Sequence, residues 1–427
     1  MWWLNFLLLI VIFILVYRKG LIYSPLSLYV LIWMLGFCVL PGGELFLQHK
    51  ISTLFYVAYF INNLLLLGLI LLFYPFSVQN STSQASPKLS SIFVFFVKIF
   101  IWCTFIYILF YGWEILSKYY DLWRHHPTTL RAMYFVEDRI KIVSNIQHIQ
   151  IFIYVVTLLS CIVIYFGDKK NSKNYIFKMP ILLSLLFSTF FLGRLVFLRV
   201  CIVYAFVYIV KNNYKLKKVI LRVLLPIAGV LIIATIMMQR VNSGSKDKMV
   251  EAIGAMSTYA SGSIVAFDIH TQDKTNKYFH GAVSLYPFYL QISKFVHGET
   301  IDFYRQCKFV KSINTYTIFR PFFDDFKWVG FFFFSFLFHL SIVYASFLKR
   351  YRNSIYAFVF YFMLYPVALF SVQAFLLHET NYMYAFFICI IFIFIFNGVK
   401  YNGNNSSNHT EDDATRETTP NSRNFLA

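Results

Sequence analysis

The chain has 427 residues, of which 59% are hydrophobic and only 13% are charged, and its formal net charge is +19. A soluble domain carries roughly 25% charged residues, so the composition excludes an ordinary soluble protein and indicates an integral membrane protein. The excess of Lys and Arg lies in short turns between apolar runs, which is typical of cytoplasmic loops and does not indicate a nucleic-acid partner.

Long apolar runs recur along the whole sequence. A transmembrane helix needs about 20 mostly apolar residues. On that rule the sequence predicts an all-α, polytopic membrane protein with about eleven transmembrane helices, near 2–17, 22–41, 53–74, 91–112, 151–167, 176–192, 195–210, 219–238, 329–348, 355–376 and 382–399. The first run precedes its basic residues, whereas a signal peptide follows them, so we expect a retained span with its N-terminus outside.

The basic turns fall on alternate connections between these spans. One side receives Arg18, Lys19, Lys88, Lys169, Lys170, Lys173, Lys211, Lys349, Arg350 and Lys400. By the positive-inside rule this side is cytoplasmic. The other side receives 42–52, 113–150, the turn at 193–194, 239–328 and 377–381.

Four regions follow from this topology. Residues 1–238 hold eight transmembrane helices, with an amphipathic loop at 113–150 that we expect to lie on the outer headgroups. Residues 239–328 form a large extracytoplasmic segment, and residues 329–400 hold three more helices. The polar tail at 401–427 is predicted to be disordered and cytoplasmic.

Three arginines lie at the predicted outer ends of spans. Arg194 is at the tip of a tight hairpin, Arg199 lies ~7 Å deeper on a helical rise, and Arg240 is at the mouth of the next span. An arginine at headgroup depth either contacts lipid phosphate nonspecifically or belongs to a site for a pyrophosphate-linked lipid, because the guanidinium fork matches phosphate oxygens.

The outer segment adds polar candidates with two interpretations. Glu251, Tyr259, Asp268 and His270 lie among small polar residues, which suit either a sugar-binding groove or an ordinary surface. The stretch 314–330 carries further candidates directly before a span, namely Asn314, Thr317, Arg320, Asp324 and Asp325. An isolated charge there is costly, so we expect either a structural Arg–Asp pair or a site for a hydroxylated, phosphate-bearing substrate.

Three stretches resemble the bacterial O-antigen and oligosaccharide repeat-unit polymerases of the Wzy type. Residues 23–29 and 32–36 resemble the second span of that family, and 193–194 after 188–189 resembles its central hairpin. The third is its Asn-x-x-Thr…Asp-Phe-Gly…Gly signature, carried here by Asn314, Thr317, Asp325, Phe326 and Gly330. Lys327 stands where the family usually has glycine after Asp-Phe.

The resemblance implies a GT-C-like membrane glycosyltransferase that works without a metal or other cofactor. Its substrate would be an undecaprenyl-pyrophosphate-linked oligosaccharide within membrane lipid, and a chain-length regulator and a flippase would be its partners. It implies catalytic roles for Arg194, Arg240, Arg320, Asp268 and Asp325. It further implies substrate contacts by Arg199, Tyr259, Asn314, Thr317, Glu251 and His270.

Three alternatives stay open from the sequence. The first is an O-antigen ligase, which also has many spans and a large outer loop. The second is a lipid-linked oligosaccharide flippase or exporter, in which two similar halves are expected but not found in this sequence. The third is a non-catalytic scaffold, which would not need arginines at the mouths of spans.

Overall fold

The protein is helical in every part that the computed structural model describes. The described residues are 1–74, 87–126, 130, 143–192, 194–212, 261–273, 317–351, 354–372 and 380–397. Their helices are α1 (Trp2–Arg18), α2 (Pro25–Leu47), α3 (Thr53–Phe73), α4 (Ser91–His125), α6 (Val143–Phe166), α7 (Lys169–Lys173), η1 (Tyr175–Lys178), α8 (Met179–Phe190), α9 (Arg194–Asn212), α15 (Arg320–Tyr351), α16 (Ile355–Phe370) and α17 (Thr380–Asn397). A further helical segment covers 261–272.

Six of the described helices are long and apolar enough to cross a membrane, namely α2, α3, α4, α6, α9 and α15. Four shorter apolar helical stretches accompany them, namely α1, η1 with α8, α16 and α17. The predicted span at 219–238 and the tail at 401–427 lie outside the described residues.

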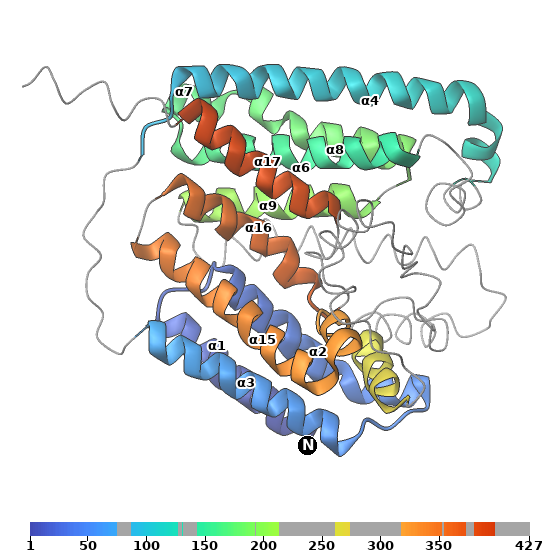
Figure 1. The fold of residues 1–427 in the computed structure, drawn as a ribbon, viewed down its shortest axis with the longest axis vertical. Coiled ribbons are helices and arrows are strands. Elements are labelled where there is room, and N and C mark those ends of the chain that lie inside the picture. The colour runs from blue at the N-terminus through green and yellow to red at the C-terminus, as the bar shows by residue number, and fades with distance from the viewer. Residues whose placement is uncertain are drawn as a thin grey trace, which may run out of the picture.

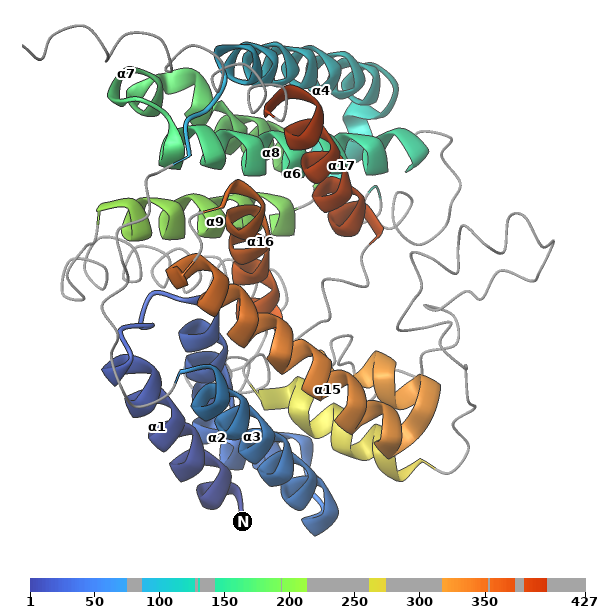
Figure 2. The same ribbon diagram turned by 60° about the vertical axis from the view of Figure 1, so that its left-hand side comes forward.

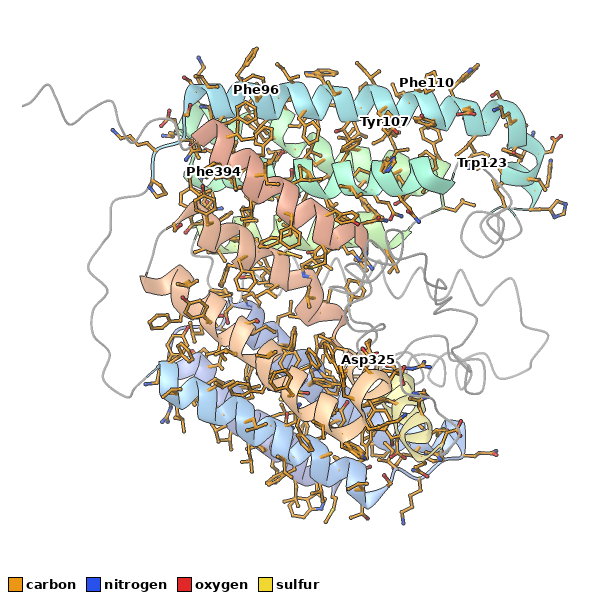
Figure 3. The ribbon with its side chains drawn as sticks, viewed as in Figure 1. Phe96, Tyr107, Phe110, Trp123, Asp325 and Phe394 are labelled. Atoms are coloured by element: carbon orange, nitrogen blue, oxygen red, sulfur yellow. The ribbon has the colours of Figure 1, made fainter. Side chains whose placement is uncertain are left out.

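Large apolar side chains lie on the outer surface of the bundle. On α4, Phe110 is 66% exposed and Trp113 is 73% exposed, and Phe394 on α17 is 71% exposed. Phe110 points away from the neighbouring helices (Figure 3). Extended apolar surface of this kind is rare on monomeric soluble proteins, so composition and surface together indicate a membrane-embedded protein.

The helices form two groups joined by one central helix. Helices α1, α2, α3 and α15 make one group, and α4, α6, α8, α9 and α17 make the other (Figure 1). Helix α16 lies between the groups in both views and packs against members of each (Figures 1 and 2). Of its 16 residues, all but Tyr356, Phe360 and Leu369 are buried.

One end of the bundle, here called the Asp268 end, gathers the starts of α3, α15 and α17 and the end of α16. The backbone N–H of Ile318 donates to the carbonyl of Ser371 at 2.8 Å, which joins the start of α15 to the end of α16. The amide of Asn381 donates to Gln150 at 2.8 Å, which joins the starts of α17 and α6. Asp268 itself is bonded to Ser52, at the start of α3.

The opposite end, here called the Lys211 end, gathers the other ends of the same helices. The Ser90 N–H before α4 donates to Asn397 at the end of α17 at 3.2 Å. Lys211 at the end of α9 donates to the carbonyl of Ile164 near the end of α6. The described helices therefore run in the alternating directions that the sequence predicts, with the described basic turns away from Asp268.

Helix α4 is longer than its predicted span, which we placed at 91–112. It continues to His125 as part of the region expected to be a separate interfacial loop, with non-helical dihedrals at Tyr119. The reason is local chemistry: no proline interrupts the sequence between Gly112 and Pro127, so nothing stops the backbone hydrogen bonds. Helix α6 likewise begins at Val143, before the predicted 151.

Helix α15 also begins earlier than predicted, at Arg320 instead of 329, and it contains a sharp reversal. Lys327 has φ 54° and ψ −140°, so 320–326 form a separate helical turn that folds back on the rest. Gly330 permits this close approach, because a Cβ on it would lie 2.1 Å from the carbonyl oxygen of Phe322. The last residues of the predicted 239–328 segment are thus part of the helical bundle.

The conformation of Lys327 gives a stability prediction. A residue with a Cβ is strained by about 1–3 kcal/mol in such a region, whereas glycine is not. The Lys327 ammonium lies 5.2 Å from the ring centre of Phe323, a contact worth about 0.5–1 kcal/mol when exposed. Relief of strain should win, so Lys327→Gly should raise the stability by about 1 kcal/mol, measured as the temperature at which half of the detergent-solubilised protein stays monodisperse.

The matched control is Lys98→Gly in the interior of α4. It should lower the stability by about 1 kcal/mol, because glycine is a poor helix residue. If Lys327→Gly is as destabilising as Lys98→Gly, the reversal at 327 is not strained.

Candidate functional site

The helical segment 261–272 is anchored at the Asp268 end by one aromatic residue. Phe267 is fully buried, and its ring centre lies 5.7 Å from that of Phe55 on α3 and 5.8 Å from that of Phe323 on α15. This packing holds the segment between two helices that are far away in the sequence. It places the neighbouring polar residues Asp268 and His270 inside the bundle rather than on a surface loop.

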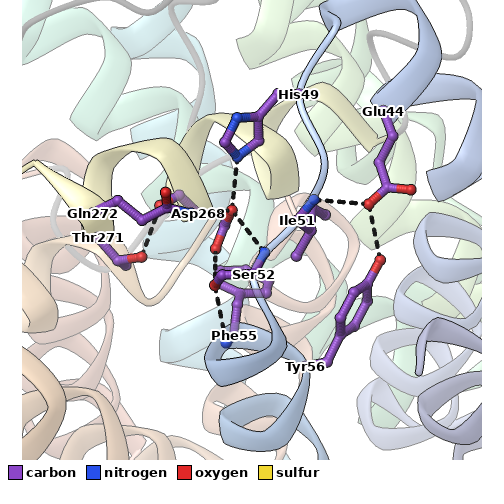
Figure 4. Close-up of polar contacts among 9 residues, drawn as sticks. All are labelled: Glu44, His49, Ile51, Ser52, Phe55, Tyr56, Asp268, Thr271 and Gln272. Atoms are coloured by element: carbon purple, nitrogen blue, oxygen red, sulfur yellow. Dashed lines mark hydrogen bonds and ion pairs between the residues drawn. The ribbon is translucent and has the colours of Figure 1, made fainter.

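Asp268 is the hub of the first polar group. Its side chain is fully buried and accepts from the Ser52 hydroxyl at 2.6 Å through Oδ1 (Figure 4). Its Oδ2 accepts from the Ser52 backbone N–H at 3.1 Å and from the Gln272 amide at 2.8 Å. The same oxygen lies 2.8 Å from Nε2 of His49. Hydrogen bonds to both oxygens stabilise a carboxylate in a buried position.

Glu44 fixes the short turn that carries His49. Its Oε1 accepts from the backbone N–H of Ile51 at 2.9 Å and from the hydroxyl of Tyr56 at 3.1 Å (Figure 4). The backbone N–H of His49 also donates to the carbonyl of Glu44 at 3.1 Å. Carboxylates on two different elements therefore hold the connection between α2 and α3.

The second polar group surrounds Asp324 in the first turn of α15. Its Oδ2 accepts from Nε of Arg320 at 3.3 Å, and its Oδ1 is hydrogen-bonded to Nε2 of His270. The side chains are only 4% exposed for Arg320, 5% for Asp324 and 8% for His270. The Arg–Asp pair that the sequence suggested is therefore present, and it involves Asp324.

Thr317 and Asp325 are also buried at this end of the bundle. Thr317 is 1% exposed, and its hydroxyl lies near that of Tyr59, but neither group meets hydrogen-bond geometry with a described residue. Asp325 is fully buried where α15 adjoins segment 261–272 (Figure 3). Neither side chain is presented to solvent as a sequence-based surface model requires.

Arg199 lies in the other group of helices and is buried, not spread among headgroups as nonspecific lipid contact would require. It is 4% exposed, donates to the hydroxyl of Tyr154 at 2.9 Å and lies 5.8 Å from the ring centre of Phe370. It borders a small cavity lined by Tyr154, Thr157, Leu158, Arg199, Val200, Val203, Pro366 and Tyr382.

The end of α16 connects Arg199 to the Asp268 end. Phe370 contacts the guanidinium, and the next residue, Ser371, accepts from the backbone of Ile318, two positions before Arg320. The two arginines with described side chains therefore approach the end of α16 from the two groups of helices. The other predicted residues cannot be compared: Arg194 starts α9 with its side chain outside the described part, and Arg240, Glu251, Tyr259 and Asn314 lie wholly outside it.

Sequence analysis missed His49, Ser52 and Glu44. All three lie in or next to the turn at 42–52, which was predicted to be an outer connection but was given no chemical role. The available signal was a turn with an acid and a histidine on the same predicted side as 239–328. Only the packing of Phe267 shows that Asp268 reaches this turn.

Comparisons with known proteins add no relative: no protein-family model matches the chain, and no curated protein or solved structure matches it significantly. Within the described residues, no group of three or more His, Cys, Asp or Glu side chains could hold a metal ion. What the site offers is a buried guanidinium, several carboxylates and two imidazoles at the end of an apolar bundle. These groups can bind an anion and transfer a proton.

Proposed function

We propose that the chain polymerises undecaprenyl-pyrophosphate-linked oligosaccharide repeat units into O-antigen or a related surface polysaccharide. The reaction would take place at the outer face of the bacterial cytoplasmic membrane. The observation that carries this proposal is the gathering of Arg320, Asp324, His270 and Asp268 at the end of the bundle where α3 and α15 begin.

The chemistry of glycosyl transfer needs the groups found there. The bond between the anomeric carbon and the lipid diphosphate breaks, and its electron pair leaves with a diphosphate oxygen. Positive groups such as Arg320 and Arg199 would stabilise that leaving group without changing protonation state. A base would take the proton of the acceptor hydroxyl as the new glycosidic bond forms.

The bundle also supports the proposed topology. The basic residues of the described turns, Arg18, Lys19, Lys88, Lys169, Lys170, Lys173 and Lys211, belong to connections at the Lys211 end. The positive-inside rule then puts that end in the cytoplasm and the Asp268 end outside. The proposal includes eleven spans in a GT-C-like arrangement, with the N-terminus outside and the C-terminus inside.

Acidic residues in the described helices lie near helix ends and not at mid-membrane, as with Glu44, Glu114, Asp121 and Asp324. Coupled transporters and proton relays typically place carboxylates within their spans. This distribution favours an enzyme over a lipid-linked oligosaccharide flippase or exporter.

The glycan of a deletion strain tests the proposal. Deleting the gene should replace the ladder of long surface glycan by a product with a single repeat unit attached to the acceptor, as resolved on a silver-stained gel. Wild-type complementation should restore the ladder. Loss of all attached glycan would instead indicate a ligase or an exporter and contradict the polymerase.

A further inference from the structure

The sequence suggests acids and His270 as bases for the proposed transfer, but their environments do not suit that role. Asp268 already accepts from donors on both of its oxygens and has no exposed side-chain surface. His270 is 8% exposed and its Nε2 is bonded to Asp324. A base must reach the acceptor hydroxyl, so a buried and saturated group is poorly placed.

His49 differs from these residues in its access. Its side chain is 22% exposed, while its Asp268 partner is 0% exposed. One face of the ring is therefore held by a buried carboxylate, and another part reaches the surface at the Asp268 end. This is the arrangement that orients an imidazole for proton transfer in carboxylate–histidine pairs.

The hydrogen bonds also define which ring nitrogen holds the hydrogen. Asp268 Oδ2 accepts from the Ser52 backbone N–H and from the Gln272 amide, two groups that can only donate. This oxygen is therefore an acceptor, so Nε2 of His49, 2.8 Å away, must donate to it. In the neutral ring Nδ1 then has the lone pair and can accept a proton.

We propose that His49 is the general base of the glycosyl transfer and that Asp268 is its positioning residue. Nδ1 takes the proton of the acceptor hydroxyl while the hydroxyl oxygen forms the bond to the anomeric carbon and the diphosphate departs. The resulting imidazolium lies against the Asp268 carboxylate, which stabilises its charge. The inference rests on the proposed function and names the base within it.

Other titratable groups surround this histidine. Glu44 and Tyr56 hold the turn from α2 and α3, Lys50 follows His49 in the chain, and Asp268 faces it from segment 261–272. The tests must therefore separate proton transfer by His49 from its tether to Asp268. Two substitutions do so: glutamine can keep a donor toward Asp268 but cannot take a proton, and alanine can do neither.

The assay uses full-length protein in nanodiscs and the lipid-linked repeat unit extracted from the deletion strain. We expect wild type to form polymer, and His49→Gln and His49→Ala to turn over about 100-fold slower or less, the usual contribution of a general base. Binding of the lipid-linked unit should be unchanged. Added imidazole should partly restore His49→Ala, and the acidic limb of the pH–rate profile should disappear from both variants.

The control is His126→Ala, since His126 is exposed after α4 and makes no side-chain bond to the described site. It should keep the wild-type rate. A His49→Gln variant with the wild-type rate and pH profile overturns the base assignment alone, as does a slow variant that no longer binds substrate. Absence of polymer with wild type overturns the proposed function and this inference together.

Discussion

Asp268→Ala should be among the most destabilising substitutions in the described part of the protein. The carboxylate accepts hydrogen bonds from Ser52, Gln272 and His49, which belong to three places in the chain. Bonds to a charged group contribute about 1.5–3 kcal/mol each, and a buried donor left without an acceptor adds a penalty. We expect the stability to fall by about 3 kcal/mol or more, measured by thermal aggregation in detergent, together with loss of the glycan ladder.

Asp168→Ala is the matched control, because Asp168 is exposed before α7 and its side chain makes no cap hydrogen bond. It should leave stability and glycan unchanged. Asp268→Asn should fall between the two, since its amide keeps one oxygen but opposes donors with a donor. A wild-type melting temperature for Asp268→Ala would show that segment 261–272 does not depend on this hub.

Gly330→Ala should disrupt the start of α15. A Cβ there would lie 2.1 Å from the Phe322 carbonyl oxygen and 2.8 Å from Cβ of Phe326, so the turn at 320–326 must move. Overpacking of this kind costs about 1–3 kcal/mol. Because that turn carries Arg320 and Asp324, we expect the glycan ladder to shorten or vanish even in protein that still inserts, as measured on gels beside quantified membrane protein.

Gly68→Ala in α3 is the control for Gly330→Ala. A Cβ at Gly68 would meet no atom within 4 Å, and alanine favours helix by up to about 1 kcal/mol. This variant should be as active and at least as stable as wild type. Equal behaviour of the two alanine variants would mean that the reversal at 327 can relax without affecting the site.

The sequence was sufficient for the positions of the helices because apolar runs and basic turns are local signals. Helices occupy the main part of every predicted span that the structure describes. Their ends were harder to place, since helix termini depend on capping and tertiary contacts. Helix α4 continues to His125 past its apolar run, and the reversal at Lys327 depends on Gly330 having room beside Phe322.

The candidate site was only partly accessible from the sequence. Arg320, Asp268 and His270 were chosen as polar residues near a span, and this local reasoning correctly put them close to the bundle. Their partners are not local: Asp268 meets His49 across 219 positions, and His270 meets Asp324 across 54. No periodicity reports such pairings, so the burial of Asp268 and the exposure of His49 had to come from the fold.

The near-complete burial of α16 bears on how the protein is made. This helix is among the last to leave the ribosome, yet both groups of helices depend on it for their common interface. Until it enters the bilayer, the earlier helices must wait with their inner faces uncovered, sheltered by lipid or by the insertion machinery. Assembly of the catalytic end is thereby tied to completion of synthesis, so an interrupted chain would contain every residue around Asp268 except those that bring the two groups together.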